Sequence, residues 1–270
     1  MELTWELILI LILCGILFGA LTTMAGEGGG IFFVSFMVLV LGMAFEEARD
    51  TSIFIILIAS GSAFFTYLKQ RRTDIKLSLI FSSFAILGSI LCWIFLFFFP
   101  VSNESLRIIF GLVLLITAAN MIFKTYKDRN SSNSSQYDEF DIKRFDFKKD
   151  LKKGIPFFMV AGFASRLIGI GGGIIHGPSL HILFGFPIHN ATAVSSSIVF
   201  FTAIFNTALL IFYGKINYQI GIFLGMGSVI GAIIGAKISH RMPKIYLQIF
   251  VAMLLIFVGI NMLFSIIVAE

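Results

Sequence analysis

Eight long segments of this chain contain no Asp, Glu, Lys or Arg, and their length determines whether the fold is built for water or for a lipid bilayer. A helix needs about 20 apolar residues to cross the hydrocarbon core of a bilayer. The segments are continuously apolar and do not alternate every second residue, which favours membrane helices over a transmembrane β-barrel. They cover residues 7–26, 28–45, 51–68, 77–103, 108–123, 167–214, 216–236 and 245–269.

The composition supports the same interpretation. Charged residues make up 13% of the 270 residues, whereas soluble globular proteins carry about 25%. The formal net charge of +5 comes from connections between the apolar segments, so no nucleic-acid partner is expected. We therefore predict an all-α, multi-pass membrane protein, with the lipid bilayer as its surroundings.

A triplet of glycines reveals an internal repeat. Gly28, Gly29 and Gly30 recur as Gly171–Gly173 at an offset of 143 residues. Self-similarity at a fixed offset is the signature of a duplicated unit. The same offset also relates other pairs: Gly26 and Gly169, Gly42 and Gly185, Ala48 and Ala191, Ser52 and Ser195, Gly88 and Gly231, Pro100 and Pro243.

The chain is accordingly divided into three parts. A first membrane repeat covers 1–123 and a second covers 154–270. Between them, residues 124–153 contain nine Lys or Arg and six Asp or Glu, together with a run of Ser and Asn. Such a composition is typical of a solvated linker without a core of its own.

Short basic loops predict the orientation of the repeats, because Lys and Arg collect on the cytoplasmic side. Residues 69–76 are basic and the linker is rich in Lys and Arg, whereas 100–105 is not basic. In the second repeat the signs exchange: the counterpart of 69–76 keeps only Lys215, and the counterpart of 100–105 carries Lys237, Arg241 and Lys244. We predict inverted repeats, a cytoplasmic linker and both termini outside.

Inversion requires an odd number of crossings in each repeat, and we expect about five helical segments per copy. The first two segments of each copy form a hairpin broken at the glycine triplet, and the two hairpins are predicted to meet near the membrane centre. The expected segments are 6–24, 28–45, 51–68, 77–99 and 105–123, then 156–169, 172–186, 191–213, 218–239 and 245–267.

The two glycine triplets are the candidate binding site. Gly-broken segments at matching positions of inverted halves are a sequence indication of a transporter's site. A helix that begins at Gly28–Gly30 or at Gly171–Gly173 presents unpaired N–H groups and the positive end of its dipole to a small anion. The competing interpretation is close helix packing, for which glycine is also common in membranes.

Two charged residues adjoin the triplets. Arg166 has a guanidinium suited to an oxyanion, and the alternative is that its side chain snorkels to the cytoplasmic face. Glu27 is assigned to coupling or charge compensation: it neutralises Arg166 in the empty state or carries a coupling proton. A purely structural pair of Glu27 with Arg166 is equally compatible with the sequence.

Polar residues of the 191–213 segment complete the candidate site. Ser195 and Ser196 either cap the helix start or donate to a bound anion, and Asn206 either joins helices or lines a pore. The histidines have no metal-binding spacing and Cys14 and Cys92 stand singly, so neither a metal ion nor another cofactor is expected. The histidines considered are His176, His181 and His189.

These residues resemble a known family. The stretch Gly169–Gly173, followed by Pro178, Leu180, Gly185, Ala191 and Ser195–Ser196, is similar to the signature of the TauE/SafE sulfite exporters. The first copy departs from it, with Ser35 in place of Pro178, Arg49 in place of Thr192, and Glu27 among its glycines. The resemblance implies a permease that moves sulfite or small organosulfonates, sulfoacetate among them, across the plasma membrane.

Both lines of reasoning lead to an anion transporter. No nucleotide-binding loop is present in the sequence, so we expect a secondary carrier that exports a small sulfur-containing anion by alternating access. An anion channel and an uptake carrier for thiosulfate or sulfate are the alternatives, followed by an intramembrane enzyme. The partners expected are the anion and the bilayer, and a homodimer is left open.

The predicted orientation can be tested by labelling in intact cells. Ser134→Cys lies in the linker and Asn103→Cys lies in the non-basic connection, so the two should respond oppositely to a membrane-impermeant thiol reagent. We expect only Asn103→Cys to react above the background of the parent chain. Labelling of Ser134→Cys from outside would overturn the orientation.

Overall fold

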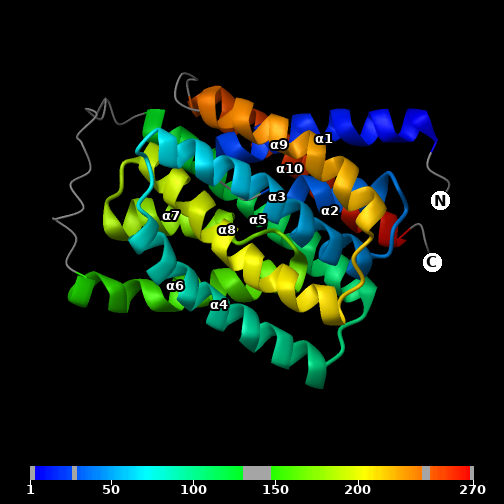
Figure 1. Ribbon diagram of the computed structural model, residues 1–270, viewed down its shortest axis with the longest axis horizontal. Helices are drawn as coiled ribbons and strands as arrows, with labels where there is room; N and C mark the ends of the chain where they lie inside the picture. The colour runs from blue at the N-terminus through cyan, green and yellow to red at the C-terminus, as the bar shows by residue number, and fades with distance from the viewer. Residues whose placement is uncertain (1–3, 26–28, 130–146, 239–243, 268–270) are drawn as a thin grey trace.

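The computed structural model describes residues 4–25, 29–129, 147–238 and 244–267, which form ten helices and contain no strand (Figure 1). Six of the helices within these residues are long and apolar enough to cross a membrane. The helices are α1 (Trp5–Ala25), α2 (Gly30–Leu39), α3 (Phe45–Lys69), α4 (Ile75–Phe98), α5 (Asn103–Arg129), α6 (Phe147–Ile168), α7 (Gly173–Phe184), α8 (Ile188–Tyr213), α9 (Tyr218–Ile238) and α10 (Lys244–Ile267).

The order of helices matches the expected segments, but α5 continues to Arg129 instead of ending at residue 123, and α6 begins at Phe147 instead of residue 156, so both enter the expected linker. The boundary between α2 and α3 was also predicted wrongly. Helix α2 ends at Leu39 instead of residue 45, and a turn with Gly42 at φ 66° follows it. Helix α3 then begins at Phe45 instead of residue 51. Acidic residues in its first turn are favourable beside the positive end of the helix dipole. The charged residues 46–50 therefore belong to a helix and not to a connection.

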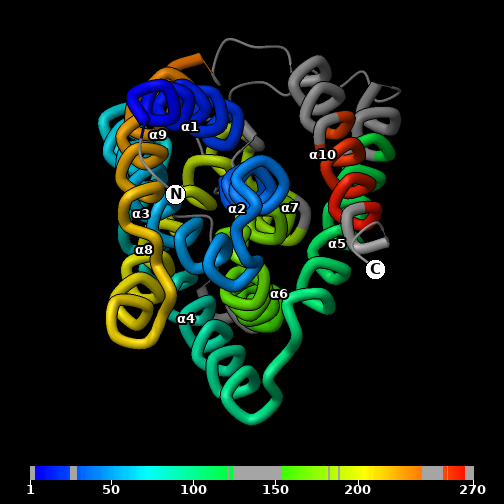
Figure 2. The backbone as a smooth tube through the Cα atoms, turned by 90° about the vertical axis from the view of Figure 1, so that its right-hand side faces the viewer, coloured from blue at the N-terminus to red at the C-terminus, as the bar shows by residue number. Residues whose placement is uncertain are grey.

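Helices α2 and α7 are short and lie inside the bundle. They contain 10 and 12 residues, which corresponds to about half the thickness of a hydrocarbon core. Each follows a glycine in the left-handed conformation, Gly29 at φ 90° and Gly172 at φ 76°. Figure 2 shows α2 and α7 enclosed by the longer helices.

The packing of the two halves repeats itself at the offset of 143 residues. Helix α1 packs along α9, and their counterparts α6 and α4 pack in the same way. Glycines provide the closest backbone approaches in both pairs, because an added Cβ would overlap the facing backbone. In the α1–α9 pair, Gly19 faces Ser228 and Gly231 faces Ile16. At the equivalent places of the α6–α4 pair, Gly162 faces Ala85 and Gly88 faces Met159.

Two further pairs join each helix to its own counterpart, and both pairs are antiparallel. In α5 and α10, Gly111 lies against Leu263 and Leu115 against Gly259. In α3 and α8, Gly61 likewise meets Phe200 while the turn after α3 meets the start of α8. Antiparallel counterparts imply a two-fold axis perpendicular to the helices, which inverted repeats require. The inverted topology relative to a membrane stays a prediction.

The helix ends fall into two groups, one at each end of the bundle, in the combination that the basic loops predicted. Helix α1 begins and α10 ends at one end of the bundle, beside the α8–α9 loop. Helix α5 ends and α6 begins at the other end, on the same side as the turn between α3 and α4 (Figure 1). The side of the membrane on which each end lies remains a prediction.

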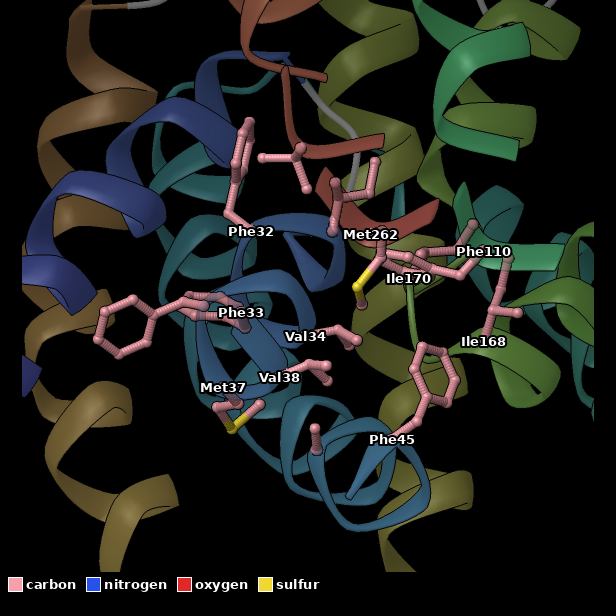
Figure 3. Close-up of a cluster of buried hydrophobic side chains, with 14 of the residues drawn as sticks. Phe32, Phe33, Val34, Met37, Val38, Phe45, Phe110, Ile168, Ile170 and Met262 are labelled. Atoms are coloured by element: carbon pink, nitrogen blue, oxygen red, sulfur yellow. The ribbon is translucent and has the colours of Figure 1, made fainter. Parts of the chain in front are cut away.

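A cluster of buried hydrophobic side chains holds α2 in place (Figure 3). Phe33, Val34 and Met37 of α2 are fully buried. They belong to the same cluster as Phe45 of α3 and Ile170 of the second glycine loop. This packing fixes the start of α2, where the first glycine loop ends, relative to the second glycine loop.

The glycine contacts predict a specific loss of stability. In Gly162→Ala the new methyl group would overlap the backbone of Ala85, and overpacking of this kind costs about 1–3 kcal/mol. The midpoint of thermal unfolding of the detergent-purified protein should fall. Gly177→Ala is the matched control, because the nearest atom to a Cβ there is Ser195 Oγ at 4.0 Å. Equal midpoints for the two variants would contradict the packing analysis.

Candidate functional site

The two glycine loops touch each other in the interior. The Cα atom of Gly30 lies against the carbonyl of Gly169 and the backbone of Ile170, so that any Cβ would overlap them. Ser52 Oγ donates a hydrogen bond to the Gly169 carbonyl at 2.7 Å. Gly30 is thus placed against the second loop, and packing alone accounts for the glycine at this position, whereas Gly29 lies beside Thr22 and Phe33. Gly28 lies outside the described residues.

The second loop has a conformation that only glycine adopts readily. Gly171 and Gly172 have φ values of 80° and 76°, in the left-handed region where a Cβ is strained. Gly172 is also backed by the Ala161 carbonyl, and Gly173 begins α7. Ser195 Oγ lies 3.5 Å from the Gly173 carbonyl, so Ser195 adjoins this loop, and Ser196 is buried beside it in α8.

A buried cluster of three charges lies next to the glycine loops. Arg166 at the end of α6 donates from Nη1 to Asp50 Oδ1 at 3.0 Å. Arg49, beside Asp50 in α3, donates from Nε to the same oxygen at 2.9 Å. The backbone N–H of Lys215 reaches Asp50 Oδ2 at 3.2 Å. One carboxylate therefore joins both halves of the chain.

The cluster is almost completely removed from solvent. The side chains of Arg49, Asp50 and Arg166 are 4%, 3% and 8% exposed. Charges in such surroundings are stable only when they are paired and hydrogen-bonded. Arg166 Nε nevertheless has no hydrogen-bond partner among the described residues. The site thus combines two guanidiniums with one carboxylate and keeps a free donor on Arg166.

Sequence reasoning found Arg166 but missed its partner. The buried ion pair shows that Arg166 does not snorkel, and Asp50, 116 residues away in the chain, was not considered. Both Arg49 and Asp50 fall just before the helix that was expected over 51–68. A signal was present, since Asp50 is followed directly by an uncharged segment and its repeat counterpart is Ala193. Glu27 lies outside the described residues.

Asn206 extends the polar region into α4. Its Nδ2 donates to Ser89 Oγ at 3.3 Å, and Ser89 Oγ donates to the Gly162 carbonyl at 3.0 Å. Gly162 lies one helical turn before Arg166. Asn206 Oδ1 is buried and has no partner among the described residues. Asn206 therefore joins helices through its nitrogen and leaves an acceptor oxygen for another group.

The α8–α9 latch covers one end of this region. It consists of residues 214–217 held on the start of α3. Lys215 Nζ donates to Glu46 Oε2 at 2.9 Å, and this hydrogen bond raises the pKa of the Lys215 ammonium above its usual value. The backbone N–H of Asn217 donates to Thr51 Oγ1 at 2.9 Å. These contacts hold the α8–α9 loop next to Asp50.

The α3–α4 latch is its counterpart at the other end of the bundle. It consists of residues 70–74 held on α8. Arg72 Nη2 donates to the His189 carbonyl at 2.9 Å, and Thr73 Oγ1 lies 2.7 Å from Ser197 Oγ. Arg72 and Lys215 are repeat counterparts at the offset of 143, as are Glu46 and His189. In each case a loop of one half is therefore held on the start of a helix of the other half.

Two other features of the described residues differ in chemistry from this cluster. A groove of about 480 Å³ between α1, α2 and α10 is mostly apolar, with Phe18, Phe32 and Phe257 in its wall. His176 is buried and stacked on Phe158 with ring centroids 5.4 Å apart. No group of three His, Cys, Asp or Glu side chains with metal-binding geometry occurs within the described part of the chain.

Comparison with known proteins places the chain in a family of membrane transporters. Residues 11–262 match the family model "Sulfite exporter TauE/SafE". The chain is 24% identical over 271 residues to "Probable membrane transporter protein YunE" of Bacillus subtilis, covering 95% of this chain and 97% of the relative. It is 24% identical to "Probable membrane transporter protein MJ0441" of Methanocaldococcus jannaschii, with 94% of each chain covered.

No solved structure matches the chain. The family model nevertheless spans the glycine loops, the three-charge cluster and both latches. The chain is a multi-pass membrane transporter that belongs to the sulfite exporter TauE/SafE family.

Proposed function

We propose that this transporter is a secondary carrier that exports a small sulfur-containing anion, sulfite or an organosulfonate, by alternating access. The observation that carries the proposal is the buried cluster of Arg49, Asp50 and Arg166 between the two halves. The substrate class and the direction of transport are carried over from the family that the chain matches.

Arg166 is the residue that would bind the anion. A guanidinium offers its donors in a planar fork that suits two oxygens of a sulfonate or sulfite. Asp50 occupies Nη1, whereas Nε has no partner among the described residues. The Arg49–Asp50 pair remains in place when an oxyanion binds at Nε, so binding needs no rupture of the ion pair.

The two latches support alternating access. A carrier must close its site from each side in turn, and the α8–α9 and α3–α4 latches lie at opposite ends of the bundle. Both hold a loop of one half on a helix start of the other half. Release of one latch at a time would open the central cluster to one side only.

The role of Arg166 can be tested by binding measurements. Losing a charge-assisted hydrogen bond costs about 1.5–3 kcal/mol, or about tenfold to a hundredfold in affinity. Arg166→Ala should therefore weaken sulfite or sulfonate binding by about that factor, and Arg166→Lys by less. The fold should survive, because Arg49 still neutralises Asp50. Isothermal titration calorimetry of the purified protein measures the affinities.

Lys69→Arg is the control, because it exchanges the same two residue types at an exposed position at the end of α3, outside both latches. Its affinity should equal that of the parent chain. Unchanged binding in Arg166→Ala would refute the role of Arg166 and leave Arg49 and the helix starts as donors.

The α8–α9 latch predicts a change in local opening. Lys215→Glu replaces the attraction to Glu46 with repulsion. Both side chains are exposed, at 70% for Lys215 and 41% for Glu46, so the effect is about 1 kcal/mol or less, or up to about fivefold in the opening equilibrium. Hydrogen–deuterium exchange over residues 45–52 should accelerate by that factor.

The charge-swapped double variant, Glu46→Lys with Lys215→Glu, should return the exchange rate toward that of the parent chain. If the single variant exchanges at the parent rate, or if the double variant does not restore it, the ion pair does not hold the loop.

A further inference from the structure

We infer that the three-charge cluster selects singly charged oxyanions over doubly charged ones. This inference rests on the proposed function and narrows its substrate class. Arg49 and Arg166 contribute two positive charges and Asp50 one negative charge, so the cluster carries a surplus of one positive charge among the described residues. An anion with one negative charge completes the balance.

The net charge of the cluster controls which anion binds because the cluster is buried. In an open groove, water would screen a surplus charge at little cost, but an unpaired charge in a dry interior is strongly unfavourable. Each of the three residues is more than nine-tenths buried. A dianion in the site would leave one uncompensated negative charge and should bind more weakly, although its attraction to the arginines is greater in water.

The acidic neighbours of the cluster within the described residues have partners outside it, and Glu47 accepts a hydrogen bond from Asn217 Nδ2 at 3.0 Å. Glu46 lies 3.8 Å from Arg49, but it forms a hydrogen bond with the ammonium of Lys215, and both are solvated at the surface. The repeat counterparts of Arg166 and Asp50 are Thr23 and Ala193, which are uncharged. Neither half therefore supplies a compensating charge at the position equivalent to a residue of the cluster.

Two buried polar atoms of this region are available to a ligand. Arg166 Nε is an unpartnered donor and Asn206 Oδ1 is an unpartnered acceptor among the described residues. Alkyl sulfonates satisfy the donor, and hydrogen sulfite, which has a hydroxyl form, offers both an acceptor and a donor. Sulfate, thiosulfate and sulfoacetate carry two negative charges near neutral pH and are expected to bind less well than a monosulfonate.

Titration of the full chain with a matched pair of anions tests the inference. Methanesulfonate and methanedisulfonate differ in charge and share the sulfonate group. In the detergent-purified protein we expect methanesulfonate to bind at least about tenfold more tightly, because the dianion leaves a buried charge unpaired. Sulfite itself should bind more tightly as the pH falls and hydrogen sulfite replaces the dianion.

Asp50→Asn reverses the expected preference. The substitution keeps the shape of the side chain and raises the surplus charge to two, so methanedisulfonate should become the tighter ligand. Glu104→Gln removes an exposed carboxylate at the start of α5 and should keep the parent preference. If Asp50→Asn does not fold, the comparison of the two anions and the pH series on the parent chain decide.

The outcomes separate the inference from the proposed function. If neither anion binds the parent chain, the proposed function fails. If both bind and the dianion binds as tightly, or if Asp50→Asn leaves the preference unchanged, the charge count is wrong while the function stands. If Glu27→Gln shifts the preference as much as Asp50→Asn, the carboxylate of Glu27 belongs to the site and the inference is overturned.

Discussion

One carboxylate, Asp50, connects parts of the chain that are far apart in sequence. It accepts hydrogen bonds from its neighbour Arg49, from Arg166 at the end of α6 and from the backbone of Lys215 after α8. A buried charge left without any compensating partner costs about 3–5 kcal/mol, so Asp50 favours the arrangement of α3, α6 and the α8–α9 loop in which these contacts form. The free donor of Arg166, the surplus charge and the latch above the site all follow from this arrangement.

Close backbone contacts provide the frame around that cluster. Lipid exerts little hydrophobic force between helices, so membrane helices associate through small residues that let their backbones approach. Gly19, Gly88, Gly162 and Gly231 do this at equivalent places in the two halves, and Gly30 does it between the glycine loops. The glycines therefore allow the helices to pack closely and fix where the packed helices and loops lie. In the proposed carrier, anion binding depends mainly on the guanidiniums beside them.

The two repeats form a similar scaffold, and the charged residues of the cluster stand where the sequences of the two repeats differ. Arg166 stands where the first half has Thr23, and Asp50 stands where the second half has Ala193. The charged cluster consequently lies on one side of the glycine loops, while the latches occur on both sides. In the proposed carrier, a single charged site can thus be reached from either end when the corresponding loop is released.

Local and periodic properties could be predicted from the sequence: the membrane helices, their order, the duplication and the breaks at Gly29 and Gly172 follow from apolar length, the 143-residue offset and glycine's conformational freedom. Arg166 was found because a lone charge in an apolar segment is conspicuous. Its pairing with Asp50 required the fold, because two groups 116 residues apart meet only when α3 and α6 pack together. The early start of α3, the two latches and the surplus charge were likewise decided by tertiary contacts, which no local pattern encodes.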